Sequence, residues 1–306
     1  DQILNLVENV LETGDREPQS EAYLKAIIAA FENSSTKKDF VKNVPKMHRD
    51  SLPPPPTNFK QLDTHEFGNK FRQSSMMELN NLLNKTIEIV SSYDGYRLPL
   101  KWAWTYKFDA NGFLKKFKAR LCVRGDLQLP SISKKYAAIL EMKLFRADMA
   151  IVCAFDLETR QYDLVNALCN ARLNKPDQRT LPPGFEHLGV AVKLHRALHG
   201  LKESPRLWYQ TLKNCLAKFG FGEVPGVNCL MKGRNIIIIF YVDDLILLYW
   251  PLNKLVADEF DIYLSSNFET TFLGEAKWFL GIQIVRDKLE KKLWLSQESY
   301  CAKIGA

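Results

Sequence analysis

The pattern of apolar and polar positions divides the chain into a helical beginning, a proline-rich stretch and a long mixed remainder. In residues 1–33 the apolar residues recur at helical spacing, which predicts two short amphipathic helices around Thr13-Gly14-Asp15. Pro53 to Pro56 follow, and four consecutive prolines cannot continue a helix or a central strand. We therefore predict a helical N-terminal segment over residues 1–47 and an extended linker over residues 48–60.

Beyond the linker, stretches with helical spacing alternate with stretches of strand character, which predicts an α+β domain over residues 61–306. Helices are predicted at 76–83, 133–153, 204–219 and 254–268. Short strands are predicted at 86–90, 161–164, 278–285 and 293–295.

A β-hairpin is predicted over residues 101–124. Trp102, Trp104 and Tyr106 alternate on one face of its first strand, and residues 109–112 have the composition of a turn. These aromatic side chains could stack on nucleic-acid bases. Alternating aromatics are more typical of a core, so we predict that they are buried.

Composition is that of a folded protein and excludes several classes. Of 306 residues 46% are hydrophobic and 25% charged, which excludes a disordered chain. The longest apolar run, 236–250, is interrupted by two aspartates, so no membrane span is predicted, and the N-terminus lacks a secretory pattern. The six cysteines form no CxxC pair, which predicts reduced thiols inside the cell. His195 and His199 are four residues apart, but no third zinc ligand accompanies them.

The net charge of +7 (42 Lys+Arg minus 35 Asp+Glu) is unevenly distributed. Residues 1–33 carry seven acids and two bases, a local −5, whereas residues 101–124 carry seven bases and one acid, a local +6. Lys118, Arg120 and Arg124 share one face of the returning strand. This face is either an ordinary solvated surface or a contact for a polyanion such as nucleic acid.

Two adjacent carboxylates interrupt the most apolar part of the chain. Aliphatic runs flank Asp243 and Asp244, which predicts a second hairpin over residues 236–249. A solvated turn is one interpretation, because Asp is common in turns. A metal-binding pair is the other, because the turn lacks the Gly or Asn that tight hairpins prefer and buried carboxylates need a partner.

A pair of divalent ions that serves phosphoryl transfer requires a further carboxylate. Asp163 is the candidate, because it lies near the end of the strand predicted at 161–164. Asp156 competes with it, although residues 154–158 have the character of a helix end. Spacing alone does not decide between the two.

The sequence YVDD at 241–244, set between apolar strands, resembles the polymerase signature of reverse transcriptases. Further segments resemble, in order and spacing, the copia-type class of LTR retrotransposons, with details closest to fungal members: FKARLCVRG at 117–125, QYDLVNA at 161–167, LPPGF at 181–185, HGLKESP at 199–205, LGEAKWFLG at 273–281 and LSQESY at 295–300. The four-letter signature alone is weak, but an ordered set over roughly residues 48–304 is specific. The chain therefore looks like a fragment of a retrotransposon Pol polyprotein.

The resemblance implies a fingers-and-palm polymerase, with fingers at about 85–150 and a palm at about 151–290. The palm of such an enzyme is a ferredoxin-like antiparallel sheet backed by helices. The implied activity is RNA-directed DNA polymerisation on an RNA template from a DNA or RNA primer with dNTPs, in a cytoplasmic particle or the nucleus. The ribonuclease H and integrase segments of the polyprotein are expected outside this chain.

The same resemblance assigns roles to individual residues. The catalytic and metal-binding role falls on Asp163, Asp243 and Asp244, which would hold two Mg²⁺ ions, with Mn²⁺ as a possible substitute. Nucleotide binding falls on Lys118, Arg120, Leu168 and Tyr241. The grip on the primer end falls on Phe279, Leu280 and Gly281.

Two positions depart from the family pattern. Leu168 stands where an aromatic side chain usually excludes the ribose 2′-hydroxyl, and Glu203 stands where Gln or a base is frequent. These departures leave a second hypothesis open: a catalytically inactive or co-opted retrotransposon remnant that binds nucleic acid. A structural α/β protein with a coincidental Asp-Asp turn does not explain the ordered segments.

Overall fold

The computed structural model describes residues 44–83, 85–90, 92, 98–109, 111–128, 140–186 and 191–304. The predicted N-terminal helices and the first third (133–139) of the helix predicted at 133–153 lie outside the described residues. No helix within the described ranges is both long enough and apolar enough to cross a membrane.

The chain folds into two compact units, and each unit is built from two separate stretches. The first unit comprises residues 1–131 and 172–202, and the second comprises residues 132–171 and 203–306. The division therefore differs from the predicted contiguous segments of 85–150 and 151–290. The proline stretch over 53–56 has neither helix nor strand, as predicted, but it lies within the first unit instead of between two units.

The first unit combines one long helix with a two-stranded and a three-stranded antiparallel sheet. Its elements are η1 (Arg49–Ser51), η2 (Phe59–Asp63), α4 (Gly68–Leu83), β1 (Ile87–Val90), β2 (Leu100–Phe108), β3 (Leu114–Val123), η3 (Gly125–Leu127), β5 (Arg172–Arg179) and β6 (Ala191–Arg196). The hairpin predicted at 101–124 is confirmed as β2–β3, with Trp102 paired with Leu121. Strands β5 and β6 were not predicted; β6 pairs with both β1 and β5.

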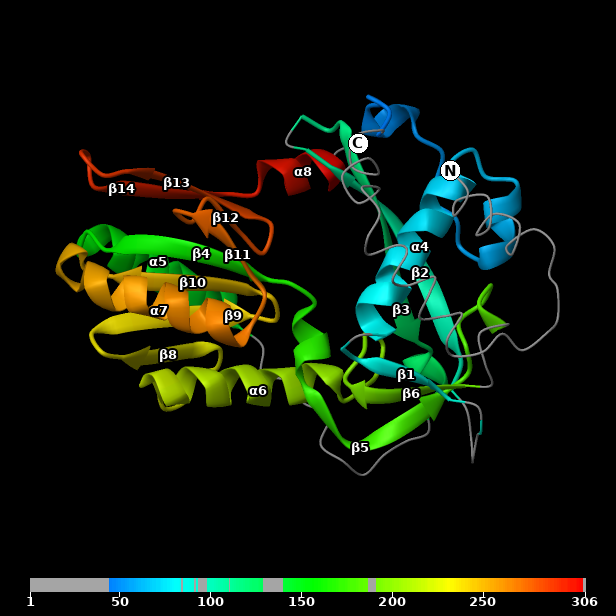
Figure 1. Cartoon of the computed structure of the whole chain (residues 1–306). Helices are drawn as coiled ribbons and strands as arrows, with labels where there is room; N and C mark the ends of the chain where they lie inside the picture. Colours follow the sequence, from blue (N-terminus) through cyan, green and yellow to red (C-terminus); the bar gives the residue numbers. More distant parts are fainter. Residues whose placement is uncertain are drawn as a thin grey trace. The chain divides into compact units, whose positions relative to one another are not determined.

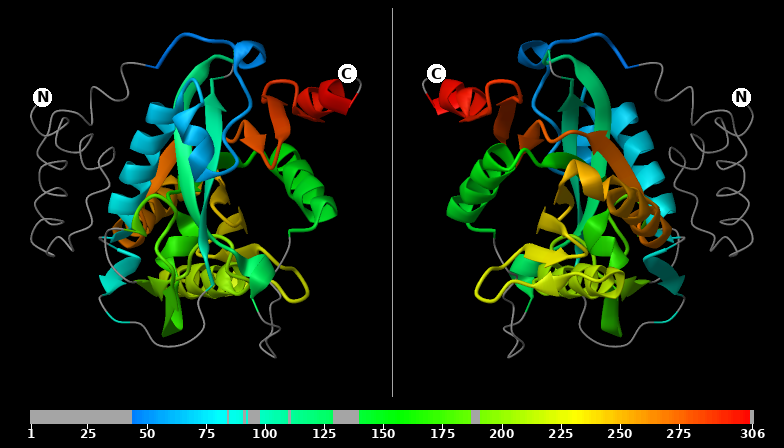
Figure 2. Two further views of the ribbon diagram at one scale, coloured as in Figure 1. Left: turned by 90° about the vertical axis from the view of Figure 1, so that its right-hand side faces the viewer. Right: turned by 90° about the vertical axis from the view of Figure 1, so that its left-hand side faces the viewer.

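The core of the first unit lies between α4 and the β2–β3 hairpin, which run side by side in Figure 2. Trp102 and Trp104 are buried, which confirms the core role predicted for them. The Trp104 indole N–H donates to Ser75 Oγ on α4 at 2.9 Å. Phe71 of α4 meets the Phe117 ring of β3 edge to face, with centroids 5.2 Å apart.

The second unit is a six-stranded antiparallel sheet in the order β11-β4-β10-β9-β8-β7, with a smaller β12-β13-β14 sheet and several helices. Its elements are α5 (Met142–Ala154), β4 (Glu158–Leu164), η4 (Ala167–Asn170), α6 (Ser204–Phe219), β7 (Gly222–Glu223), β8 (Leu230–Gly233), β9 (Ile236–Tyr241), β10 (Asp244–Tyr249), η6 (Pro251–Asn253), α7 (Lys254–Asn267), β11 (Thr270–Gly274), β12 (Trp278–Phe279), β13 (Ile282–Asp287), β14 (Lys292–Ser296) and α8 (Glu298–Ile304). The predicted α+β class, with antiparallel sheets backed by helices, is confirmed.

Most predicted elements of the second unit are present, with two corrections. The helix predicted from residue 133 begins at Met142 in the described part of the chain. The strand predicted at 278–285 is split into β12 and β13, because Leu280 and Gly281 have φ values of 50° and 79° and form a turn. Helix α6 has the predicted bounds and ends at Gly220, whose φ of 112° suits a residue without Cβ.

Helices α6 and α7 lie side by side (Figure 1) and cover one face of the large sheet. Phe260 of α7 meets both Tyr162 of β4 and Phe219 of α6. Next to these rings, Arg160 of β4 reaches two carboxylates of α7, Asp258 at 2.6 Å and Asp261 at 2.5 Å. Since side chains alternate along a strand, this arrangement leaves Gln161 and Asp163 on the opposite face of the sheet.

Candidate active site

The carboxylates of Asp163, Asp243 and Asp244 come from two neighbouring strands of the second unit. Asp244 begins β10 and lies directly opposite Asp163 of β4 in the antiparallel ladder. The Leu164 N–H donates to the Asp243 carbonyl at 2.8 Å, which ties the hairpin turn to the end of β4. Side chains of directly opposed residues share a face of the sheet. The structure thus brings Asp163 and Asp244 to the same side, with Asp243 in the adjoining turn.

The turn that carries Asp243 is strained and held from outside. Val242 has a φ of 55°, a conformation that is unfavourable for a β-branched residue. The Trp208 indole N–H of α6 donates to the Val242 carbonyl at 2.6 Å. Helix α6 also contacts η4, which follows β4 in the chain. Helix α6 therefore supports both the β9–β10 turn, which carries Asp243, and η4, which follows the strand that carries Asp163.

The electrostatics where β4 ends and β10 begins favour a bound cation. Burial, together with the smaller effects of the neighbouring Asp243 and Asp163 carboxylates, raises the pKa of Asp244 to about 6. A divalent ion would remove this repulsion, and an all-oxygen donor set suits Mg²⁺. Across the described residues, however, no group of three or more His, Cys, Asp or Glu side chains is arranged so that it could hold a metal ion. The three carboxylates have the right chemistry and lie at the same end of two neighbouring strands, but they do not enclose a common point.

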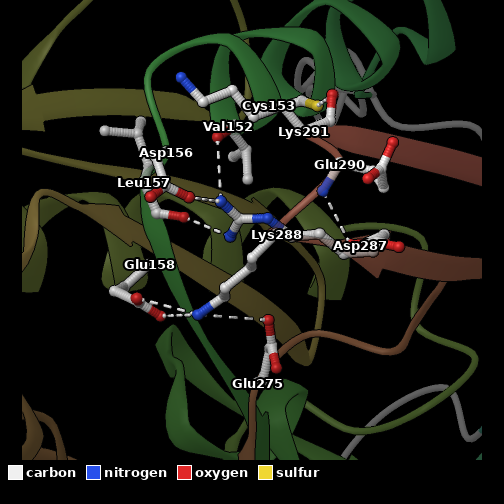
Figure 3. A network of polar contacts seen from close by, with 11 residues as sticks. Val152, Cys153, Asp156, Leu157, Glu158, Glu275, Asp287, Lys288, Glu290 and Lys291 are labelled. Atoms are coloured by element: carbon white, nitrogen blue, oxygen red, sulfur yellow. Dashed lines mark hydrogen bonds and ion pairs between the residues drawn. The ribbon is translucent and has the colours of Figure 1, made fainter.

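The competing candidate, Asp156, already has a partner. Its Oδ1 lies 2.6 Å from Arg286 Nη2, and the same guanidinium donates to the Leu157 carbonyl at 2.5 Å. Figure 3 shows Asp156 and Glu158 within this network, in which Lys288 reaches the Glu158 carboxylate at 2.7 Å. Asp156 follows the end of α5, as its sequence context predicts. The network fastens the β13–β14 hairpin to the α5–β4 connection.

The predicted primer-grip residues form a hairpin on the same face of the sheet as Asp163. Gln161 of β4 donates from Nε2 to the Trp278 carbonyl at 2.7 Å, which fixes β12 above that face. Phe279 is buried and stacks on Phe145 of α5, with centroids 5.1 Å apart. Leu280 and Gly281 form the turn that joins β12 to β13.

The predicted nucleotide-binding residues are divided between the two units. Tyr241 ends β9 opposite Asp244, and Leu168 is buried in η4, so both lie in the acidic unit. Lys118 and Arg120 lie on β3 of the first unit. Arg124 is paired with Asp126, its Nη2 2.7 Å from that carboxylate, and so contributes little free charge.

One face of the β2–β3 hairpin concentrates positive charge. Lys107 lies directly opposite Lys116 in the ladder, and Lys118 and Arg120 follow on the same face of β3. Like charges in such positions repel one another. Desolvation and the nearby Arg120 and Lys107 lower the pKa of Lys118. We call Lys107, Lys116, Lys118 and Arg120 the basic face; its mutual repulsion favours binding of an anion.

Two residues of the site were not assigned by sequence reasoning. Trp208 is part of a motif, but nothing in the sequence pairs it with Val242, which lies 34 residues further on. Glu78 of α4 interacts with the basic face from another element. The pair His195 and His199 shows no zinc site: His195 Nε2 is 2.9 Å from Glu88 Oε2, and His199 pairs through its backbone with β3.

Comparison with known proteins identifies a matching protein family. The family model described as "Reverse transcriptase (RNA-dependent DNA polymerase)" matches residues 84–305. The Pol polyprotein of tobacco transposon TNT 1-94 is 29% identical over 262 residues, 81% of this chain and 20% of the tobacco protein. The Pol polyprotein of Arabidopsis thaliana transposon RE1 is 31% identical; the match covers 65% of this chain and 14% of the Arabidopsis protein. The Ty1-LR2 Gag-Pol polyprotein of Saccharomyces cerevisiae is 30% identical; the match covers 60% of this chain and 11% of the yeast protein. These matches confirm the predicted resemblance to copia-type elements.

A solved structure is also similar at lower identity. The foamy viral protease-reverse transcriptase, determined in complex with double-stranded DNA, is 14% identical, with a TM-score of 0.48, and the match covers 99% of this chain and 48% of that one. The chain spans about a fifth or less of the polyproteins that it matches.

Proposed function

Because the chain belongs to the reverse transcriptase (RNA-dependent DNA polymerase) family, we propose that it copies an RNA template into DNA by extending a primer with dNTPs. The observation that supports this most is the pairing of Asp163 with Asp244 across adjacent strands, with Asp243 in the attached turn. The DNA or RNA primer, the RNA template and the dNTPs are the proposed partners, together with the ribonuclease H and integrase segments of a longer polyprotein.

Asp163, Asp243 and Asp244 do not enclose a common point in this structure, so they would have to converge to hold the two Mg²⁺ ions of nucleotidyl transfer, for which Mn²⁺ is a substitute. When bound, such ions lower the pKa of the primer 3′-hydroxyl and neutralise the departing pyrophosphate. The raised pKa of Asp244, about 6, means that this carboxyl gives up its proton only near neutrality in the absence of a cation. The site is therefore expected to lose metal affinity as the pH falls below about 6.

The remaining residues would bind and orient the substrates. The Arg120 guanidinium can hold two phosphate oxygens of the dNTP at once, and Lys118 adds a second positive charge. Leu168 would limit the space beside the sugar, and Tyr241 would flank the nucleotide. Phe279, Leu280 and Gly281 would hold the primer end on the face of the sheet that carries Asp163. Template binding through phosphate contacts should weaken with salt.

Primer extension on an RNA template with Mg²⁺ tests the proposed function. We expect extension by the unaltered chain and loss of about a thousandfold in rate with Asp243→Asn, because one charged ligand of the ions is removed. Glu259→Gln, an exposed carboxylate of α7 paired with Arg234, is the matched control and should extend normally. Equal extension by the unaltered chain and Asp243→Asn would contradict the proposal.

A second candidate function is a catalytically inactive remnant that binds nucleic acid. It is favoured by Leu168 and Glu203, which stand where the family usually has an aromatic side chain and Gln or a base. Salt-sensitive binding of a primer–template duplex without Mg²⁺-dependent extension would identify this case.

A further inference from the structure

Two polar side chains of β4 are buried on the face of the sheet that also carries Asp163. Thr159 is 7% exposed and Gln161 is 6% exposed, and side chains two apart on a strand share a face. Their directly opposed partners on β10 are Leu248 and Ile246, which are buried and apolar. Polar groups in such surroundings destabilise the fold unless they form hydrogen bonds, so both side chains need partners.

Both partners belong to the short segment that leads into the predicted primer grip. The Ala276 N–H donates to Thr159 Oγ1 at 3.1 Å, and Gln161 Nε2 donates to the Trp278 carbonyl at 2.7 Å. Strand β12 is not part of the six-stranded sheet, so side chains make these bonds instead of a backbone ladder. Positions two apart on β4 thus hold positions two apart in residues 276–278.

The spacing of these contacts leads along both segments toward the candidate site. Two residues beyond Gln161 on β4 lies Asp163, and two residues beyond Trp278 lies Leu280 in the β12–β13 turn. The ion pair of Lys288 with Glu158 ties β13 to the beginning of β4, at the end opposite Asp163 (Figure 3). Gln161 therefore links the primer-grip hairpin to β4 close to the carboxylate.

We propose that Gln161 is a positioning residue for the primer end, which, together with Thr159, fixes the primer-grip turn relative to Asp163. This inference rests on the proposed function, in which residues 279–281 hold the primer end. Without the Gln161 amide the Trp278 carbonyl loses its donor, and the turn two residues further on loses its fixed place above β4. The primer 3′-hydroxyl then meets the incoming dNTP in a less productive geometry, and a misplacement of about 1 Å can lower a rate about a hundredfold.

Single-turnover primer extension at saturating dNTP and Mg²⁺ measures this placement separately from binding and folding. The full chain is compared with Gln161→Met, which keeps the length of the side chain but cannot donate to the Trp278 carbonyl. Thr159→Val removes the other hydrogen bond, and Thr159→Ser retains the hydroxyl. Gln210→Met is the matched control, because Gln210 is an exposed residue of α6 that bonds Asn214. Fluorescence anisotropy reports primer–template affinity, and thermal unfolding sets an assay temperature at which every variant is folded.

Gln161→Met is expected to lower the single-turnover rate about tenfold, with primer–template affinity within about twofold of the unaltered chain, because phosphate contacts along the duplex supply most of the affinity. Thr159→Val should lower the rate about threefold, and Thr159→Ser and Gln210→Met should match the unaltered chain.

Three results would overturn the positioning role alone, provided that the unaltered chain extends primers. The first is a rate for Gln161→Met equal to that of the unaltered chain, with only the melting temperature lowered, as a merely structural role requires. The second is a loss of affinity as large as the loss of rate, and the third is an equal rate for Thr159→Val and Thr159→Ser. No extension by the unaltered chain would overturn the proposed function, and the positioning role with it.

Discussion

Replacing Asp148 by Asn is expected to stabilise the second unit, and to do so more strongly as the pH rises. Asp148 lies on the face of α5 that also buries Phe145, Met149 and Val152, and its side chain is 7% exposed. Its Oδ2 atom is buried without a hydrogen-bond partner. An ionised carboxylate in such a place opposes folding.

The magnitude follows from proton linkage. Burial raises the pKa of Asp148 from 3.8 to about 6. Because the pKa is higher in the folded state, the folded state loses stability as the pH rises from about 4 through about 6, and the full cost is present above that range. A difference of about two pKa units corresponds to about 3 kcal/mol. Well below pH 3.8 the carboxyl is neutral in both states, and the cost disappears.

Denaturant unfolding followed by circular dichroism measures the effect at about pH 4.5 and pH 7.5. Asp148→Asn should raise the free energy of unfolding by up to about 3 kcal/mol at the higher pH and by only about 1 kcal/mol at the lower one. Glu290→Gln, an exposed carboxylate in the β13–β14 turn, is the control and should change little at either pH. A gain from Asp148→Asn that is the same at both pH values would refute the linkage argument.

Three further substitutions test other parts of the structure. Trp208→Phe keeps an aromatic side chain but removes the indole N–H that donates to the Val242 carbonyl, and it should slow primer extension by about tenfold when assayed well below its lowered melting temperature; a rate equal to that of the unaltered chain would contradict the supporting role of α6. Arg160→Met removes the cation that Asp258 and Asp261 share and should lower the free energy of unfolding, chiefly through Asp261, because Asp258 keeps Lys254 as a partner; a neutral effect would mean that these charges are solvated. Val242→Gly should raise the free energy of unfolding by about 1 kcal/mol, because glycine tolerates positive φ; a loss would show that the valine conformation is not strained.

Elements with strong local signals were predicted from the sequence. The β2–β3 and β9–β10 hairpins have long alternating or aliphatic strands around a short turn, and these patterns suffice without tertiary context. Helix α6 has a proline in its first turn and Gly220 after its last, so both ends were predicted correctly.

Strands that depend on distant partners were missed. Strand β5 is mostly polar, and only Leu173 and Arg179 are buried along it. Its pairing with β6 closes a sheet whose third strand, β1, lies far away in the sequence. Such strands exist because of their neighbours, and local periodicity does not reveal them.

The candidate site was predictable in part. Asp243 and Asp244 stand out because they interrupt an apolar hairpin, but spacing could not choose between Asp156 and Asp163. The pairing of Asp163 with Asp244 and the ion pair of Asp156 with Arg286 separate the two candidates in physical terms.

Manganese binding to a stalled complex tests most directly whether Asp163, Asp243 and Asp244 act as one metal-binding unit. Electron paramagnetic resonance follows free Mn²⁺ during titration of the chain with an RNA template, a primer that lacks its 3′-hydroxyl and the matching dNTP; ions bound by the nucleotide alone are subtracted. A single metal-binding unit should bind about two ions per complex, with affinity at least about tenfold weaker in Asp163→Asn, Asp243→Asn or Asp244→Asn, but not in Asp156→Asn. Equal Mn²⁺ binding by all of these proteins would contradict it.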